Sequence, residues 1–253
     1  MIQSVDRAIR ILTILQGSRR MSLSEIATQL ALPPSTVHGI IKTLAAHRMV
    51  EQEHDSGRYR LGPAVLLLGN VYLESLELSN RAMRWSEDLA HRTGHAVRVG
   101  IPMVDEVIVV HHEPRPDGTR QMREVGMVLP MHATALGKAL LAFRPEDRAR
   151  CLDPEYDLRP MTGETVTDPE LLTKELDATM ATGIATESDE AILGESGLAA
   201  PLFDTSGRAV GAVGVVIPST AYPTGELVPD AVRQAARNIT RELGSSRWPV
   251  PPG

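Results

Sequence analysis

Residues 32–44 read Leu-Pro-Pro-Ser-Thr-Val-His-Gly-Ile-Ile-Lys-Thr-Leu, and the architecture of the N-terminal part can be worked out from them. Pro34 suits the first position of a helix, because proline lacks the N–H that would be unpaired there. Pro33 precedes a proline and is therefore pushed toward extended geometry. We expect a tight turn here, followed by a helix from about Pro34 to His47.

The two faces of this helix differ in character. The apolar residues fall on one face at about 100° per residue, and they are Val37, Ile40, Ile41 and Leu44. The other side and its flanks are small, polar or cationic, and they carry Ser35, Thr36, His38, Gly39, Lys42 and Thr43. No acidic residue lies between Glu25 and Glu51, which suits a helix laid against phosphates.

The flanking sequence predicts a winged helix-turn-helix. Helical spacing starts at Val5, and Ser22 with Glu25 has the spacing of a capping box, which predicts a second, short helix. Strand-like runs on either side of residues 54–57 predict a β-hairpin. We expect the helix after Pro34 to lie in the major groove, and Arg58 and Arg60 to reach phosphates or the minor groove. The alternative is a generic small domain with a solvated polar face.

The charge of the chain is divided unevenly. The formal net charge is −6, yet residues 1–63 carry eight basic and five acidic residues, a net of +3, which leaves −9 for the rest. A basic module joined to an acidic one is expected when one part meets a polyanion. Aromatic residues make up only 3% of the chain, which disfavours single-strand binders that stack bases.

Other classes of protein are disfavoured by what the sequence lacks. No apolar run is long enough to span a membrane, so we expect a cytoplasmic protein with no membrane partner. The single cysteine, Cys151, excludes an internal disulfide and is interpreted as a free surface thiol. The stretch His111-His112-Glu113 lacks a third ligand at motif spacing, and no nucleophile or nucleotide motif occurs. We expect no enzyme, no catalytic residue, no metal and no cofactor.

Several motifs in order resemble the IclR family of bacterial transcriptional regulators, over about residues 4–243. They are Ser4-Val5-Asp6-Arg7-Ala8, residues 32–38, the wing Ser56-Gly57-Arg58-Tyr59-Arg60-Leu61-Gly62, and Leu129-Pro130-Met131-His132-Ala133-Thr134-Ala135-Leu136-Gly137-Lys138-Ala139. Within the family, the stretches at 38–40, 72–74 and 109–112 are most similar to the glycerol-operon regulators. Most members carry Arg where this chain has Gly39, so direct readout is expected to differ.

The resemblance implies an α+β protein in four parts. A winged helix-turn-helix domain covers 1–63, a linker helix 64–80, a GAF-like α/β effector-binding domain 81–246, and a tail 247–253. The linker is apolar over more than one face, so we expect a homodimer, possibly a tetramer. Helices are expected at about 80–92, 134–143, 168–181 and 229–243, and strands at 95–101, 106–111, 121–128, 183–187, 198–203 and 209–217.

An effector site is expected where a strand enters the helix at Thr134. The free N–H groups of a helix start suit a carboxylate or phosphate, and Lys138 lies one turn further on. The resemblance implies contacts from Ala135, Leu136, Glu187, Gly197, Gly214 and Val216. Keto-acid-binding members have Cys and Ser where this chain has Gly197, Gly214 and Val216. We therefore expect a larger or more apolar ligand in the vacated space, or a polyol phosphate held by backbone and Lys138.

The sequence thus predicts a ligand-responsive regulator that binds double-stranded operator DNA and a small effector, an organic acid or a polyol phosphate. Repression of a catabolic operon is the favoured role. Two alternatives remain open: a small-molecule sensor whose N-terminal module makes only protein contacts, and an activator that responds to an aromatic or other organic acid.

Overall fold

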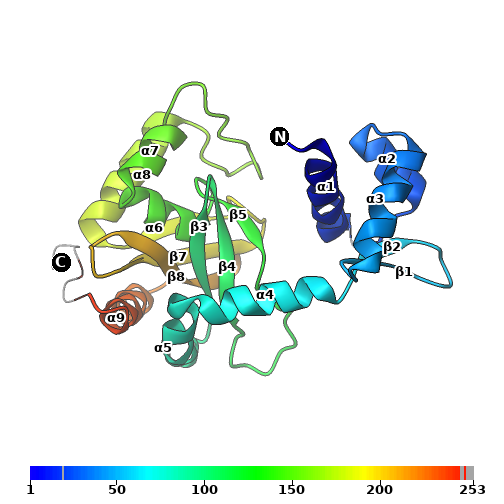
Figure 1. Cartoon of the computed structure of the whole chain (residues 1–253). Coiled ribbons are helices and arrows are strands. Elements are labelled where there is room, and N and C mark those ends of the chain that lie inside the picture. The colour runs from blue at the N-terminus through cyan, green and yellow to red at the C-terminus, as the bar shows by residue number, and fades with distance from the viewer. Residues whose placement is uncertain (19, 246–247, 249–253) are drawn as a thin grey trace. The chain divides into compact units, whose positions relative to one another are not determined.

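The N-terminal unit, residues 1–75, is a helix-turn-helix with a two-stranded wing (Figure 1). The computed structural model describes residues 1–18, 20–245 and 248. The helices are α1 (Gln3–Ser18), α2 (Leu23–Leu30) and α3 (Pro34–Ala46), and the wing strands are β1 (Val50–Gln52) and β2 (Tyr59–Leu61). The predicted capping box opens α2, since Ser22 N–H donates to Glu25 Oε2 at 2.7 Å and Glu25 N–H donates to Ser22 Oγ at 3.3 Å.

One small core orients the helices of this unit. It joins Ile11 and Leu15 of α1, Ile26 of α2, and Val37 and Ile41 of α3, all nearly inaccessible. Because the apolar face of α3 is used in this core, its polar face is turned outward.

The apolar stretch after the wing forms two helices. The first, α4 (Ala64–Ser75), ends before residue 80, the predicted end of the linker helix, and α5 (Glu77–Thr93) begins after one extended residue, Leu76. None of the side chains of α4 is buried. The second unit of the chain begins at Leu76.

The second unit is built on a six-stranded antiparallel sheet in the order β5-β4-β3-β8-β7-β6. Its strands are β3 (Ala96–Met103), β4 (Glu106–Glu113), β5 (Val128–Pro130), β6 (Ala185–Ser188), β7 (Glu195–Phe203) and β8 (Ala209–Pro218). The long central strands are almost wholly buried, as expected for a sheet covered on both faces.

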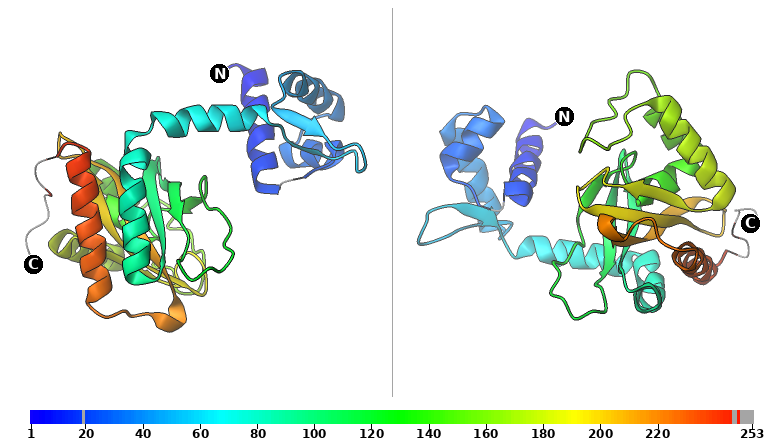
Figure 2. Two further views of the ribbon diagram at one scale, coloured as in Figure 1. Left: turned by 90° about the horizontal axis from the view of Figure 1, so that it is seen from below. Right: turned by 180° about the vertical axis from the view of Figure 1, so that it is seen from behind.

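Helices cover both faces of this sheet (Figure 1). On one face α5 packs beside α9 (Leu227–Glu242), as Figure 2 also shows. On the other lie α6 (Ala135–Ala142) and α8 (Pro169–Thr182). A short helix, α7 (Pro145–Cys151), and a 3-10 turn at Ser219–Ala221 were not predicted from the sequence.

The strand predicted over 121–128 is wrong for most of its length. The strand that pairs with β4 covers Val128–Pro130. Gly126 and Met127 are each joined to Val109 of β4 by one backbone hydrogen bond, and the segment before them is irregular. Pro114 and Pro116 offer no N–H to a ladder, and Gly118 and Gly126 adopt φ of 76° and 88°, which no extended strand allows. The predicted tail lies, apart from residue 248, outside the described residues.

Candidate DNA-binding face and effector pocket

The outward face of α3 carries the residues predicted to contact DNA. Ser35, His38, Gly39, Lys42 and Thr43 are exposed, and Thr36 is half-buried. Thr43 Oγ1 donates to the carbonyl oxygen of Gly39 at 3.2 Å. The helix therefore presents hydroxyl, imidazole and ammonium groups along one accessible strip.

The wing arginines are paired with acids of the same unit. Arg58 Nη2 lies 3.2 Å from Glu25 Oε1, and Arg60 Nη2 lies 2.6 Å from Glu51 Oε1. Glu53 takes a second contact from Arg60 at 3.7 Å. These pairs are half-exposed, and such pairs contribute roughly 0–1 kcal/mol each. Phosphates can therefore compete with the carboxylates for both arginines.

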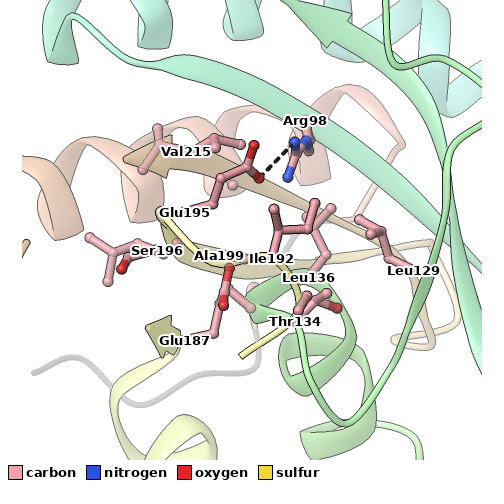
Figure 3. A pocket seen from close by; sticks show the side chains of 16 residues that line it. Arg98, Leu129, Thr134, Leu136, Glu187, Ile192, Glu195, Ser196, Ala199 and Val215 are labelled. Carbon is pink, nitrogen blue, oxygen red and sulfur yellow. Dashed lines mark hydrogen bonds and ion pairs between the residues drawn. The ribbon is translucent and has the colours of Figure 1, made fainter. Parts of the chain in front are cut away.

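A pocket opens at the N-terminus of α6 (Figure 3). Thr134 caps this helix, accepting the N–H of Gly137 at 3.1 Å and donating to the Pro130 carbonyl at 2.9 Å. Within the described part of the chain, the N–H groups of Ala135 and Leu136 have no acceptor. Two donors and the positive end of the helix dipole thus face the pocket, as an anion requires.

Gly137 allows α6 to lie this close to the loop before it. A Cβ at this position would stand 2.2 Å from both the Cα and the carbonyl oxygen of Met131. Any side chain would push the helix away, so this glycine fixes the distance between the loop and the start of the helix.

The sheet brings the other predicted contacts into register beneath the helix. Glu187 is paired with Gly197, and Gly197 with Val216, so these three form one row across β6, β7 and β8. Gly214 lies two residues from Val216 along β8, paired with Arg98 of β3. All of the predicted contacts except Lys138 line the pocket.

Lys138 lies elsewhere. Its side chain is inaccessible, and Nζ lies 2.6 Å from Glu190 Oε1, 2.6 Å from Glu175 Oε2 and 3.4 Å from the Thr186 carbonyl oxygen. Nζ therefore donates hydrogen bonds to Glu190 and to the Thr186 carbonyl oxygen, and it forms an ion pair with Glu175. The prediction that Lys138 holds the ligand is wrong in this structure, because its stem runs toward α8 and the loop after β6.

The space expected from the glycine at 214 is also missing. A Cβ there would lie 2.6 Å from the Leu198 carbonyl oxygen and 2.8 Å from the Ala199 Cβ. Neighbouring strand atoms already fill this position. The pocket has a cavity volume of only about 20 Å³, so a ligand larger than one or two waters must move side chains.

Glu187 is the acid at the α6 end of the pocket. Burial and the neighbouring carboxylate of Glu190 raise its pKa to about 7, so near neutral pH it is present in both forms. Its neutral form donates a hydrogen bond, and its charged form accepts one.

Sequence reasoning missed Arg98, Glu124 and Glu195. Arg98 is 6% exposed and lines the pocket. Its Nε donates to Glu124 Oε2 at 2.5 Å and its Nη2 to Glu195 Oε2 at 3.1 Å. Despite burial, which opposes the charge, these two carboxylates raise the Arg98 pKa above its usual value. A lone Arg in the apolar run from Ala96 to Ile101 was the available signal.

Three further expectations concern features outside the pocket. Cys151 is buried, 5% exposed, and burial raises the pKa of its thiol to about 11, so the predicted surface thiol is wrong. Among residues 1–18, 20–245 and 248, no three potential metal ligands cluster. No helix in that same set of residues is long and apolar enough to cross a membrane.

The helix-turn-helix unit and the helix-flanked pocket define the class: a transcriptional regulator that senses a small molecule. The family model of the IclR helix-turn-helix domain matches residues 4–54, and that of the bacterial transcriptional regulator IclR C-terminal domain matches residues 70–241. The chain therefore belongs to the IclR family, whose members are regulators and not enzymes.

Relatives and a solved structure match it along its length. Glycerol operon regulatory proteins of Streptomyces griseus and Streptomyces coelicolor are 44% and 42% identical, covering 98% of this chain and 98% of each relative. The structure of an IclR homologue from Microbacterium hydrocarbonoxydans, complexed with 4-hydroxybenzoate, is 26% identical with a TM-score of 0.80, covering 96% of this chain and 99% of that one.

Proposed function

We propose that this protein represses a polyol-catabolic operon and that a small effector in the α6 pocket controls its affinity for operator DNA. The observation that carries the proposal is the pair of free N–H groups at Ala135 and Leu136, which open into the pocket of a chain that also has a DNA-binding unit. The glycerol-operon relatives support the choice of operon.

The DNA contacts proposed are those of α3 and the wing. Their residues are Ser35, Thr36, His38, Gly39, Lys42, Thr43, Arg58 and Arg60. The test is a mobility-shift titration on the protein's own promoter with Lys42→Ala plus Arg58→Ala. Because this variant lacks two cations that would neutralise phosphates, its slope of log affinity against log salt should be shallower by about 2. Lys174→Ala, an exposed lysine of α8, is the matched control. Unchanged binding by the double variant would remove these residues from the DNA face.

The effector proposed is an organic acid or a polyol phosphate, with its anionic group at the start of α6. The contacts proposed are Thr134, Ala135, Leu136, Glu187, Gly197, Gly214 and Val216. A thermal-shift screen of polyol phosphates and small organic acids, followed by DNA titration with each ligand that binds, tests this. Equal DNA affinity with and without every binding ligand would contradict effector control.

Dimerisation through α4 is proposed from its unburied apolar surface. Leu66, Leu67, Leu68, Val71 and Tyr72 are each more than half exposed, and a contiguous patch of this kind marks an interaction site. Leu67→Glu should shift sedimentation toward monomer, whereas Leu171→Glu, on an exposed leucine of α8, should not. Pairing of two such dimers into a tetramer would appear as a second, concentration-dependent boundary.

Activation in response to an aromatic acid is the second candidate, and the 4-hydroxybenzoate complex of the homologue favours it. In vitro transcription from the bound promoter distinguishes repression from activation. Repression relieved by a polyol phosphate supports the first candidate, and stimulation by an aromatic acid supports the second.

A further inference from the structure

The Arg98 guanidinium has donors to spare. Its Nε and Nη2 donate to Glu124 and Glu195, but among the described residues Nη1 has no acceptor. Its side chain is only 8% exposed, and it lines the same pocket as the start of α6. Nη1 is not among the wholly buried polar atoms that lack a partner, so water or a ligand can reach this donor.

Glu195 offers the complementary group beside it. Its Oε2 accepts from Arg98, while within the described ranges its Oε1 takes part in no hydrogen bond. Glu195 also lines the pocket. Figure 3 shows Arg98 and Glu195 together at one end of the lining groups, with Thr134 and Glu187 at the other. The Arg98 end therefore presents N–H donors and a carboxylate acceptor side by side.

The charge at this end is unfavourable for an anion. One guanidinium faces two carboxylates, so Arg98, Glu124 and Glu195 together carry a formal charge of −1. A phosphate placed here would meet two like charges near its one opposite charge. Hydroxyl groups carry no such penalty, and each one both donates and accepts a hydrogen bond.

We propose that the Arg98–Glu195 pair is the subsite for the uncharged, vicinal-diol end of the effector, with the terminal hydroxyl accepting from Arg98 Nη1 and the central hydroxyl donating to Glu195 Oε1. This rests on the proposed function, which assigns the effector's anionic group to the start of α6. The pair would then discriminate polyols from their deoxy analogues, and Glu124 would hold the guanidinium in place.

The test uses full-length protein and calorimetric titration with three probes: glycerol 3-phosphate, propane-1,3-diol monophosphate, which lacks the central hydroxyl, and glycerol. Wild type should bind the first about tenfold more tightly than the second, the effect of losing hydrogen bonds to charged groups. Glu195→Gln should reduce that ratio to about threefold or less, because a neutral amide is a weaker partner. Glu155→Gln, on an exposed residue of the same unit, should leave the ratio near ten.

Glu195→Gln is chosen because Arg98 keeps its Glu124 partner, whereas removing Arg98 leaves two carboxylates without their cation and endangers folding. Equal affinity of wild type for both phosphates would overturn the proposal. Tighter binding of both by Glu195→Gln would also overturn it, by placing the phosphate at Arg98. If neither of the two phosphates nor glycerol binds, polyols and their phosphates are excluded as effectors and the subsite proposal fails. The DNA titrations described above test the proposed regulatory function independently. If glycerol binds and Glu195→Gln weakens its binding, the subsite is supported with a neutral polyol as ligand.

Discussion

Lys138 Nζ lies 2.6 Å from Glu190 Oε1, with both side chains almost wholly buried. This contact ties α6, whose start forms the pocket, to the loop that follows β6. Glu175 of α8 joins the same ammonium at 2.6 Å. The lysine is therefore a structural link beneath the pocket, and it controls the position of the helix that supplies the free N–H groups.

Removing this cation should destabilise the sensor unit strongly. Lys138→Met leaves buried Glu190 without its partner, and breaking a buried pair in this way costs about 3–5 kcal/mol. Adding Glu190→Gln should recover about half of that loss. Urea unfolding measures both, with exposed Lys174→Met as the control. A Lys138→Met protein as stable as wild type would show that the buried pair has no net effect.

The contribution of Glu187 to stability should fall as the pH rises from about 5 to 7, whereas the histidines with lowered pKa values, His95, His111, His112 and His132, contribute a slope of the opposite sign. The pKa of Glu187 is raised to about 7 in the folded protein, so the folded state binds a proton more tightly than the unfolded one. The stability this provides is present below the unfolded pKa and is lost as the pH rises through the folded pKa. The loss is about 3 kcal/mol at its full extent.

Glu187→Gln removes that titration. The free energy of unfolding of the variant should therefore increase relative to that of wild type as the pH rises over the same range. Burial also raises the pKa of Glu190, so some slope remains in the variant. Glu164→Gln, on an exposed residue, should run parallel to wild type. A constant difference between Glu187→Gln and wild type from pH 5 to 7 would show that Glu187 titrates normally.

The arginine pairs of the wing predict that removing an acid strengthens DNA binding. Arg60 is held at 2.6 Å by Glu51, and both are close to half exposed. Glu51→Gln leaves the guanidinium with its longer, 3.7 Å contact to Glu53 and removes a charge that repels phosphate. We expect operator affinity to rise about 2- to 5-fold at 0.1 M salt, with stability changed by less than about 0.5 kcal/mol. Glu155→Gln is the control. No gain at any salt concentration would place Arg60 away from the phosphates.

Features of the DNA-binding unit that depend on neighbouring residues in the sequence were predicted well. Contacts between residues far apart in the sequence were missed. The capping box at Ser22 and the proline at 34 each act within one turn of chain, so the sequence pattern contains their whole cause. The partners of Lys138 are 37 and 52 residues away. Helical spacing predicts the face of α6 on which Lys138 lies, but it does not predict which acidic residues contact the lysine.

The pocket was predicted in part for a similar reason. The row of Glu187, Gly197 and Val216 depends on strand register, which the family resemblance supplied and periodicity alone does not. Arg98 was overlooked although a charged residue in an apolar strand is a visible anomaly. The segment before β5 was wrongly predicted to be a strand. That prediction followed its apolar residues and neglected the prolines and glycines around them.

Gly39 offers a test of why a glycine stands in the middle of α3. A Cβ at this position would meet nothing within 4 Å, so packing within the protein does not require glycine. Gly39→Ala should raise the free energy of unfolding by about 0.5–1 kcal/mol, since glycine is the weaker helix former. Ala45→Gly, at an exposed position of the same helix, should lower it by a similar amount. If the backbone of α3 approaches base edges at Gly39, the alanine variant binds operator more weakly while being more stable. Equal or lower stability of Gly39→Ala would show that this helix is constrained in a way that its open surroundings do not reveal.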